Sequence, residues 1–314
     1  MAKKRPPTGF SFLADAWEFS RKQPALSAVV LWFFILPWTA MDLLSRLTSD
    51  NDLFDGTALH AFLAKNDPHN IVVTILTLGL IVLTVWGTAS ILFVARRMIG
   101  NRAGRSRTSF LAVQKQSRAL VWPLILTSLL RTCITIEWGL LFLIPALFVL
   151  LQKSGSALIR NVGALLSDGD ATSLIAHTKE VAVATPLLFM LFPLLIPAIL
   201  YRIRTSFFAV ALIAEDLRLR AALRQSARVV KGKFWYAVRC LLIMAVVWIL
   251  PAKILSMILQ SLIERHAPSL ILISDILGNT FDGASTLLFL LSLTALYGAL
   301  REPRVETVAP PKSD

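Results

Sequence analysis

Cysteine is nearly absent from this sequence: only Cys133 and Cys240 occur in 314 residues, and both lie in apolar stretches. A disulfide framework and a metal site built on paired cysteines are therefore excluded. The chain also lacks a nucleophile elbow, a Walker loop, a Rossmann glycine pattern and a zinc-protease helix motif. We therefore expect no enzyme and no cofactor.

Acidic residues are few as well, with 19 Asp and Glu against 32 Lys and Arg, whereas 56% of the residues are hydrophobic. A mean hydropathy of +0.68 is too apolar for a soluble domain of this size. The net charge of +13 does not indicate nucleic acid binding, because the basic residues lie in short segments beside apolar runs. The sequence predicts an all-α, polytopic membrane protein.

Six apolar segments are long enough to cross a hydrocarbon core of about 30 Å. We place these spans at residues 25–44, 71–95, 119–151, 181–201, 235–263 and 283–300. The third is longer than one span needs and is interrupted by charge, so it is either one bent helix or two pieces. Charge alternation in the connections predicts both termini on the cytoplasmic side of a bacterial inner membrane, with an interfacial segment at 1–24 and a polar tail at 301–314.

A weak internal repeat precedes the odd-numbered spans. Residues 11–14 and 109–112 both read Ser-Phe-Leu-Ala and are followed by Ser-Arg, and residues 221–228 are similar. The pattern predicts three two-helix units in parallel orientation. Chance similarity among basic loops is the alternative.

Residues 207–235 form the segment around which the rest of the chain is organised. On a helix of about 100° per residue, one face is small and mostly apolar, and the opposite face carries Arg220, Arg224, Arg228 and Lys231. Such a basic face suits an anionic membrane surface or an acidic protein partner. The alternative is a solvated loop that merely obeys the positive-inside rule.

Residues 196–235 also carry a family resemblance, on Pro197, Phe207, Phe208, Glu215, Ala222, Ser226, Gly232 and Trp235. The run resembles a group of bacterial multi-helix inner-membrane proteins that includes the membrane domain of some glycerophosphoryl diester phosphodiesterases. This chain has no soluble phosphodiesterase domain, and residues 154–180 look like an insertion. The resemblance implies membrane architecture and no particular reaction.

Ionisable residues within apolar runs are the remaining candidates for a site, since each is costly unless paired. Glu137 and Lys253 lie at similar predicted depth, which gives the hypothesis of an interhelical ion pair. The alternative is that Lys253 snorkels to the interface. Glu215 is expected to bond Arg218 or a helix N-terminus, or else to serve as a lipid-head-group or coupling site.

Histidines and acids on the predicted outer connections could in principle hold a metal ion: His60, His69, His177, His266, Asp50, Asp52, Asp55, Asp67, Asp168 and Asp170. No tight ligand spacing occurs among them, so we expect no metal site.

The preferred function is therefore a non-enzymatic scaffold or adaptor that engages anionic lipid, or a protein partner in the membrane, through its basic cytoplasmic helices. The alternative is a small transporter or permease subunit for a solute or lipid, with a path along the proline-rich fourth span and the charges of the third and fifth. The sequence leaves the partner, the substrate and the oligomeric state open.

Overall fold

The computed structural model describes residues 11–47, 68–99, 109–168, 192–266 and 270–301. Every secondary-structure element in these ranges is a helix, which confirms the all-α prediction. The elements are α1 (Ser11–Lys22), α2 (Pro24–Val30), η1 (Leu31–Ile35), α3 (Leu36–Leu47), α5 (Pro68–Ile99), α6 (Phe110–Asp168), η2 (Phe192–Leu195), α9 (Ile196–Arg204), α10 (Phe208–Ala214), α11 (Arg220–Val230), α12 (Phe234–Met244), η3 (Ala245–Ile249), α13 (Leu250–His266) and α14 (Ile271–Leu300).

Six helical segments in the described ranges are long and apolar enough to cross a membrane, so the chain is a polytopic membrane protein. These candidate spans are Pro24–Leu43, Thr74–Ile99, Phe110–Phe142, Pro193–Ala214, Phe234–Ile263 and Ile271–Leu300. The fourth continues past the expected end at residue 201. The sixth begins 12 residues before the expected start at 283 and so takes in five polar residues.

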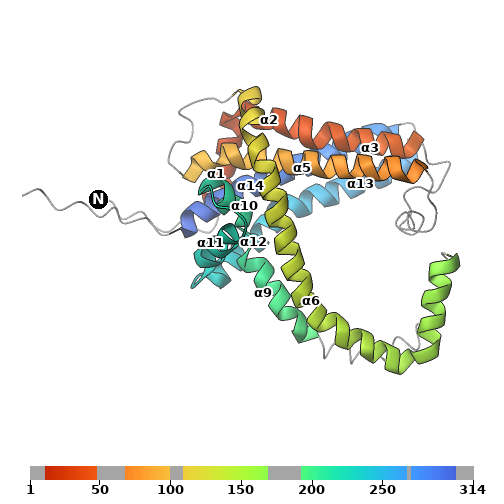
Figure 1. Ribbon diagram of the computed structural model, residues 1–314. Coiled ribbons are helices and arrows are strands. Elements are labelled where there is room, and N and C mark those ends of the chain that lie inside the picture. The colour runs from red at the N-terminus through yellow and green to blue at the C-terminus, as the bar shows by residue number, and fades with distance from the viewer. Residues whose placement is uncertain (1–10, 48–67, 100–108, 169–191, 267–269, 302–314) are drawn as a thin grey trace, which may run out of the picture.

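The helix α6 is one continuous helix of 59 residues with Pro123 and Pro145 inside it. At about 1.5 Å per residue it measures about 88 Å, which is far longer than a hydrocarbon core of about 30 Å. It also runs through residues 154–168, where an insertion between helices was expected. Figure 1 shows α6 curving away from the other spans, with α9 beside its middle part.

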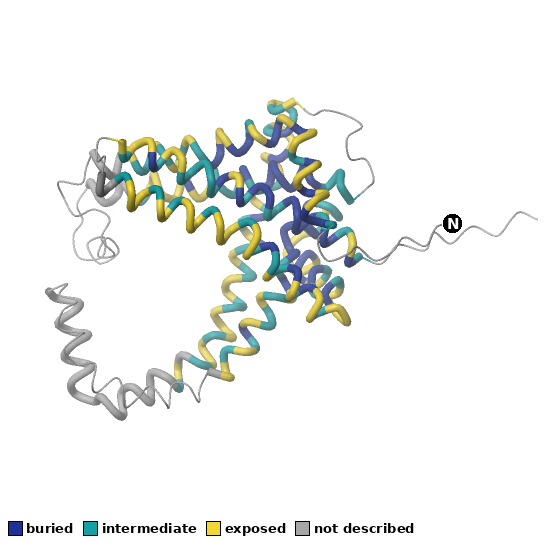
Figure 2. The backbone as a smooth tube through the Cα atoms, turned by 180° about the vertical axis from the view of Figure 1, so that it is seen from behind, coloured by how far each residue is buried: buried dark blue, intermediate teal, exposed yellow. Residues whose placement is uncertain are grey.

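The helices α3, α5, α13 and α14 run side by side, while α1, α10 and α11 pack at one end of this bundle (Figure 1). Burial is concentrated at that end, and the outer surfaces of the spans are exposed (Figure 2). The helix α14 is central, since it packs against α13, α5, α1 and η1. The short helix α10 lies in the core, with every residue from Phe208 to Ile213 buried.

Two π-helical turns occur among the described residues, and each lies just before a proline: η1 ends two residues before Pro37, and η3 ends two residues before Pro251. Proline has no amide hydrogen and its ring crowds the carbonyl four residues earlier, so the preceding turn widens. The first and fifth spans thus share a local distortion. A shared distortion is consistent with a repeat that relates these two spans. The arrangement of three two-helix units stays a prediction.

The N-terminal helix α1 differs from the interfacial helix that was expected at residues 1–24. Its apolar residues Phe12, Leu13, Ala16 and Phe19 are buried, and α1 packs against α14. The apolar face therefore contacts protein rather than lipid. Residues 1–10 lie outside the described ranges.

Candidate functional site

The helix α11 has the two faces that the sequence predicts. Ala222, Leu223, Ser226 and Val230 are buried, while the basic residues on the other side are exposed. We call these exposed residues the basic face: Arg220, Arg224, Arg228 and Lys231. Within the described part of the chain none of the four forms an ion pair.

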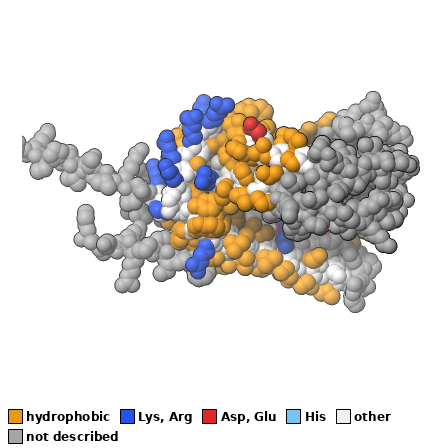
Figure 3. All heavy atoms as spheres, turned by 90° about the horizontal axis from the view of Figure 1, so that it is seen from below, with side chains coloured by type: hydrophobic (Ala, Val, Ile, Leu, Met, Phe, Trp, Pro, Cys, Tyr) orange, Lys and Arg blue, Asp and Glu red, His pale blue; other side chains and the backbone are white. Residues whose placement is uncertain are grey.

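The basic face lies at the end of the molecule where other basic residues gather. Figure 3 shows Lys and Arg side chains clustered at this end and hydrophobic side chains covering the surface beside them. Trp235 is the second residue of the candidate span Phe234–Ile263, close to the end of α11, and it is 80% exposed. Trp at the edge of an apolar span is typical of a membrane interface.

Residues 207–235 do not form one continuous helix as predicted, because the chain breaks on both sides of α11. Asp216 and Leu219 have φ of 52° and 45°, and Gly232 has φ of 80°. Side chains other than glycine rarely adopt positive φ, although Asp tolerates it better than Leu. The breaks turn α11 across the ends of the spans instead of extending either one.

Ser226 joins α11 to the interruption between α9 and α10. Its hydroxyl donates to the carbonyl oxygen of Arg204 at 2.9 Å and accepts from the amide of Phe207 at 3.1 Å. A broken helix leaves backbone groups without partners, and these are costly in an apolar environment. The buried face of α11 therefore stabilises the break in the fourth span.

Arg131 on α6 binds the same interruption between α9 and α10 from the other side. Its guanidinium donates from Nε to Thr205 Oγ1 at 3.0 Å and from Nη2 to the carbonyl oxygen of Arg202 at 2.9 Å. It also lies over the Phe208 ring, 5.1 Å from the centroid. This basic residue inside a candidate span is thus a structural partner of the broken helix.

Glu215 follows α10 and contacts neither Arg218 nor a helix N-terminus, so the expected partners are wrong. Its Oε1 accepts from the hydroxyl of Tyr297 and, at 3.3 Å, from Gln225 Nε2. Arg301 Nε lies 3.5 Å from the same oxygen, and the Glu215 side chain is only 14% exposed. One carboxylate therefore connects α10, α11 and the end of α14.

A second contact ties α11 to α14. Lys233, just after the basic face, donates from Nζ to the carbonyl oxygen of Leu300 at 3.0 Å. The last carbonyls of a helix have no partner within it, and a cation also favours the helix C-terminus. The end of α14 is therefore held by Lys233 and Glu215 together.

The hypothesis of a Glu137 to Lys253 pair is wrong. Lys253 on α13 pairs instead with Asp282 on α14, with Nζ 2.5 Å from Oδ2, and Glu137 is exposed on α6. Sequence reasoning missed Asp282 because the sixth span was expected to begin at residue 283. The missed signal is a polar stripe at helical spacing along α14: Asp275, Asn279, Asp282 and Thr286.

A second polar contact extends this stripe to the first span. Asn279 Nδ2 donates to Asp42 Oδ2 at 2.7 Å and to Thr39 Oγ1 at 3.3 Å. Paired polar groups between spans are much less costly than isolated ones. The bundle thus contains two neighbouring polar contacts on α14.

The four histidine side chains lie outside the described part of the structure. His60 and His177 lie outside the described residues, and the side chains of His69 and His266 are not described. Among the residues that the structure does describe, no group of three His, Cys, Asp or Glu side chains could hold a metal ion.

Together these features define the class of protein, which is a polytopic helical membrane protein. An amphipathic basic helix packs with its buried face across one end of the spans. Comparisons with family models, curated proteins and solved structures give no match for this chain. The resemblance to the membrane domain of glycerophosphoryl diester phosphodiesterases accordingly stays a prediction.

Proposed function

We propose that this chain is a multi-pass protein of a bacterial inner membrane, with both termini cytoplasmic, and that it organises anionic lipid through the basic face. It acts as a non-enzymatic scaffold. One observation carries the proposal: the basic face points outward from a helix whose opposite face is fixed in the fold. A solvated loop would need no such attachment.

The position of α11 supports contact with lipid head groups. Only residues 231–233 separate it from the candidate span that begins at Phe234, so the basic face stays close to the membrane boundary. Each Lys or Arg near an anionic surface contributes about 1 kcal/mol. The fixed helix also presents its cations without the entropy cost of ordering a loop on binding.

Replacing Arg220, Arg224 and Arg228 with glutamine should remove most of this lipid binding. Three charges at about 1 kcal/mol each predict an affinity loss of about 100-fold for anionic lipid. The measurement is native mass spectrometry of protein released from bilayers of phosphatidylglycerol and phosphatidylethanolamine, with bound phosphatidylglycerol counted.

The matched control is a triple replacement of Arg21, Lys115 and Arg118 with glutamine, which removes the same charge from other exposed positions. This control should retain bound phosphatidylglycerol. Equal losses in both variants would mean that total charge, and not the basic face, attracts the lipid. Loss of a stoichiometric protein partner instead of lipid would favour the adaptor function.

A further inference from the structure

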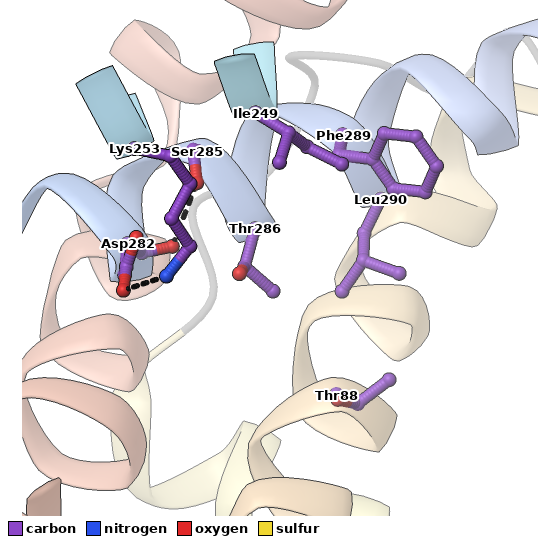
Figure 4. Close-up of a pocket in the computed structure, with 8 residues that line it drawn as sticks. All are labelled: Thr88, Ile249, Lys253, Asp282, Ser285, Thr286, Phe289 and Leu290. Atoms are coloured by element: carbon purple, nitrogen blue, oxygen red, sulfur yellow. Dashed lines mark hydrogen bonds and ion pairs between the residues drawn. The ribbon is translucent and has the colours of Figure 1, made fainter. Parts of the chain in front are cut away.

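A pocket of about 270 Å³ lies between α5, α13 and α14, away from the basic face. Lys253 and Asp282 face each other on one side of it, and apolar side chains lie on the other (Figure 4). Its lining residues are Thr88, Ile249, Lys253, Asp282, Ser285, Thr286, Phe289 and Leu290. All of them belong to candidate spans.

The charged side of the pocket has unused hydrogen-bonding capacity. Asp282 Oδ2 accepts from Lys253, and the Asp282 side chain is 36% exposed, whereas its Oδ1 is buried without a partner among the described groups and is not accessible to a ligand. The Lys253 side chain is 62% exposed, and an ammonium has three donors. The pocket therefore offers free ammonium donors beside Asp282 Oδ2, which can accept a second hydrogen bond.

A purely structural ion pair explains these observations poorly. The helices α13 and α14 pack along their length, and η3 is tied to α14 by Trp248 Nε1, which donates to Ser292 Oγ at 3.0 Å. Charged groups in spans are costly, and they mark binding sites and transport paths more often than packing contacts.

The two sides of the pocket differ in depth. Asp282 lies 18 residues before Leu300, or about 27 Å along α14 from the end near α11. It is therefore near the far boundary of a hydrocarbon core of about 30 Å. Phe289 and Leu290 lie about two turns deeper, together with Ile249 of η3. A polar boundary and an apolar interior fit an amphiphile.

We propose that this pocket binds a zwitterionic phospholipid whose head group is phosphoethanolamine. The phosphate accepts from the Lys253 ammonium, the primary amine donates to Asp282 Oδ2, and the start of an acyl chain covers Phe289 and Leu290. A choline head group has no N–H donor for Oδ2. A purely anionic head group would place a second negative charge beside Asp282 without a matching cation.

The test reconstitutes the full chain in bilayers with equal amounts of phosphatidylethanolamine, phosphatidylcholine and phosphatidylglycerol, and counts the lipid retained in native mass spectrometry. One retained phosphatidylethanolamine is expected, preferred about tenfold over phosphatidylcholine, because one charge-assisted hydrogen bond separates them. The variant Asp282→Asn should lose the preference. Equal retention of ethanolamine and choline lipids by the native chain would overturn the proposal.

Two further variants keep the test decisive. Leu290→Trp fills the apolar side while leaving both charges in place, and it should lose the retained lipid even if Asp282→Asn fails to fold. Asp42→Asn changes an acid of α3 that is bonded outside the pocket, and it should keep the preference. A preference that survives both pocket variants would overturn the site.

Soluble phosphoethanolamine separates a lipid from a free solute. It should raise the melting temperature of the detergent-solubilised chain much less than phosphatidylethanolamine does, since it leaves the apolar side empty. Equal stabilisation by the two would show that the pocket takes a soluble zwitterion and would overturn the lipid assignment.

Discussion

Replacing Gly87 with alanine is expected to lower the free energy of unfolding by about 1–3 kcal/mol, because the new methyl group has no space. A Cβ atom at Gly87 would lie 2.6 Å from Phe33 Cβ and 2.6 Å from Phe34 Cε2. Both phenylalanines are buried on the first span, so neither can move away freely. Close approach of α5 to η1 thus requires glycine, as small residues permit close helix contacts in membranes generally.

Gly79→Ala is the matched control for this prediction. It lies on the same helix, and a Cβ atom there meets nothing within 4 Å. Alanine favours helix by up to about 1 kcal/mol over glycine, so this variant should be neutral or slightly more stable. The measurement is thermal unfolding of the detergent-solubilised protein followed by tryptophan fluorescence. Equal effects of the two variants would contradict the packing shown at Gly87.

Gly283 on α14 is also in close contact with the first span. A Cβ atom there would lie 2.8 Å from Val30 Cγ1 and 3.6 Å from Phe34 Cβ. Both α5 and α14 therefore contact the first span through a glycine. The first span is held between them, which is why one added methyl group on either helix should disturb the whole bundle.

The fold class and the two faces of α11 could be predicted because both are local properties. Hydropathy over about 20 residues identifies a span, and a period of 3.6 residues separates Ala222 and Ser226 from Arg224 and Arg228. Neither signal depends on which helices become neighbours. The breaks at Asp216 and Leu219 carry no glycine or proline, so the local sequence gave no reason to expect them.

Contacts between distant segments were beyond the reach of the same arguments. Glu215 and Tyr297 are 82 positions apart. The apolar face of α1 has the same periodicity whether it packs on lipid or on α14, so the sequence does not distinguish the two. Asp282 was placed outside the sixth span because a hydropathy window counts its charge as a cost and cannot count the partner, Lys253, that reduces it.

The charges of the third span lie elsewhere than the path of the transport alternative required. A path along the third, fourth and fifth spans was expected, but Arg131 is engaged with the broken backbone near Thr205 and Glu137 is exposed on α6. The polar stripe instead follows α14, which is the most buried of the six candidate spans. The polar stripe and the contact of Glu215 with Tyr297 therefore lie on the same helix.

Glu215 contacts Tyr297 and Arg301 at the end of α14 and Gln225 on α11. Replacing it with alanine is expected to lower the free energy of unfolding by about 2–3 kcal/mol, because the buried hydroxyl of Tyr297 then loses its carboxylate acceptor. Tyr297→Phe removes the donor and leaves Glu215 with Gln225 and Arg301, so it should cost only about 1 kcal/mol. Thermal unfolding with tryptophan fluorescence measures both.

The double variant separates a direct bond from two independent defects. If Tyr297 and Glu215 interact as the structure shows, Glu215→Ala combined with Tyr297→Phe should cost less than the two single changes added together. Asp216→Asn is the control, since Asp216 is exposed beside Glu215 and asparagine tolerates its φ of 52°. Additive losses in the double variant, or a control as unstable as Glu215→Ala, would show that α10, α11 and α14 are not held together by this carboxylate.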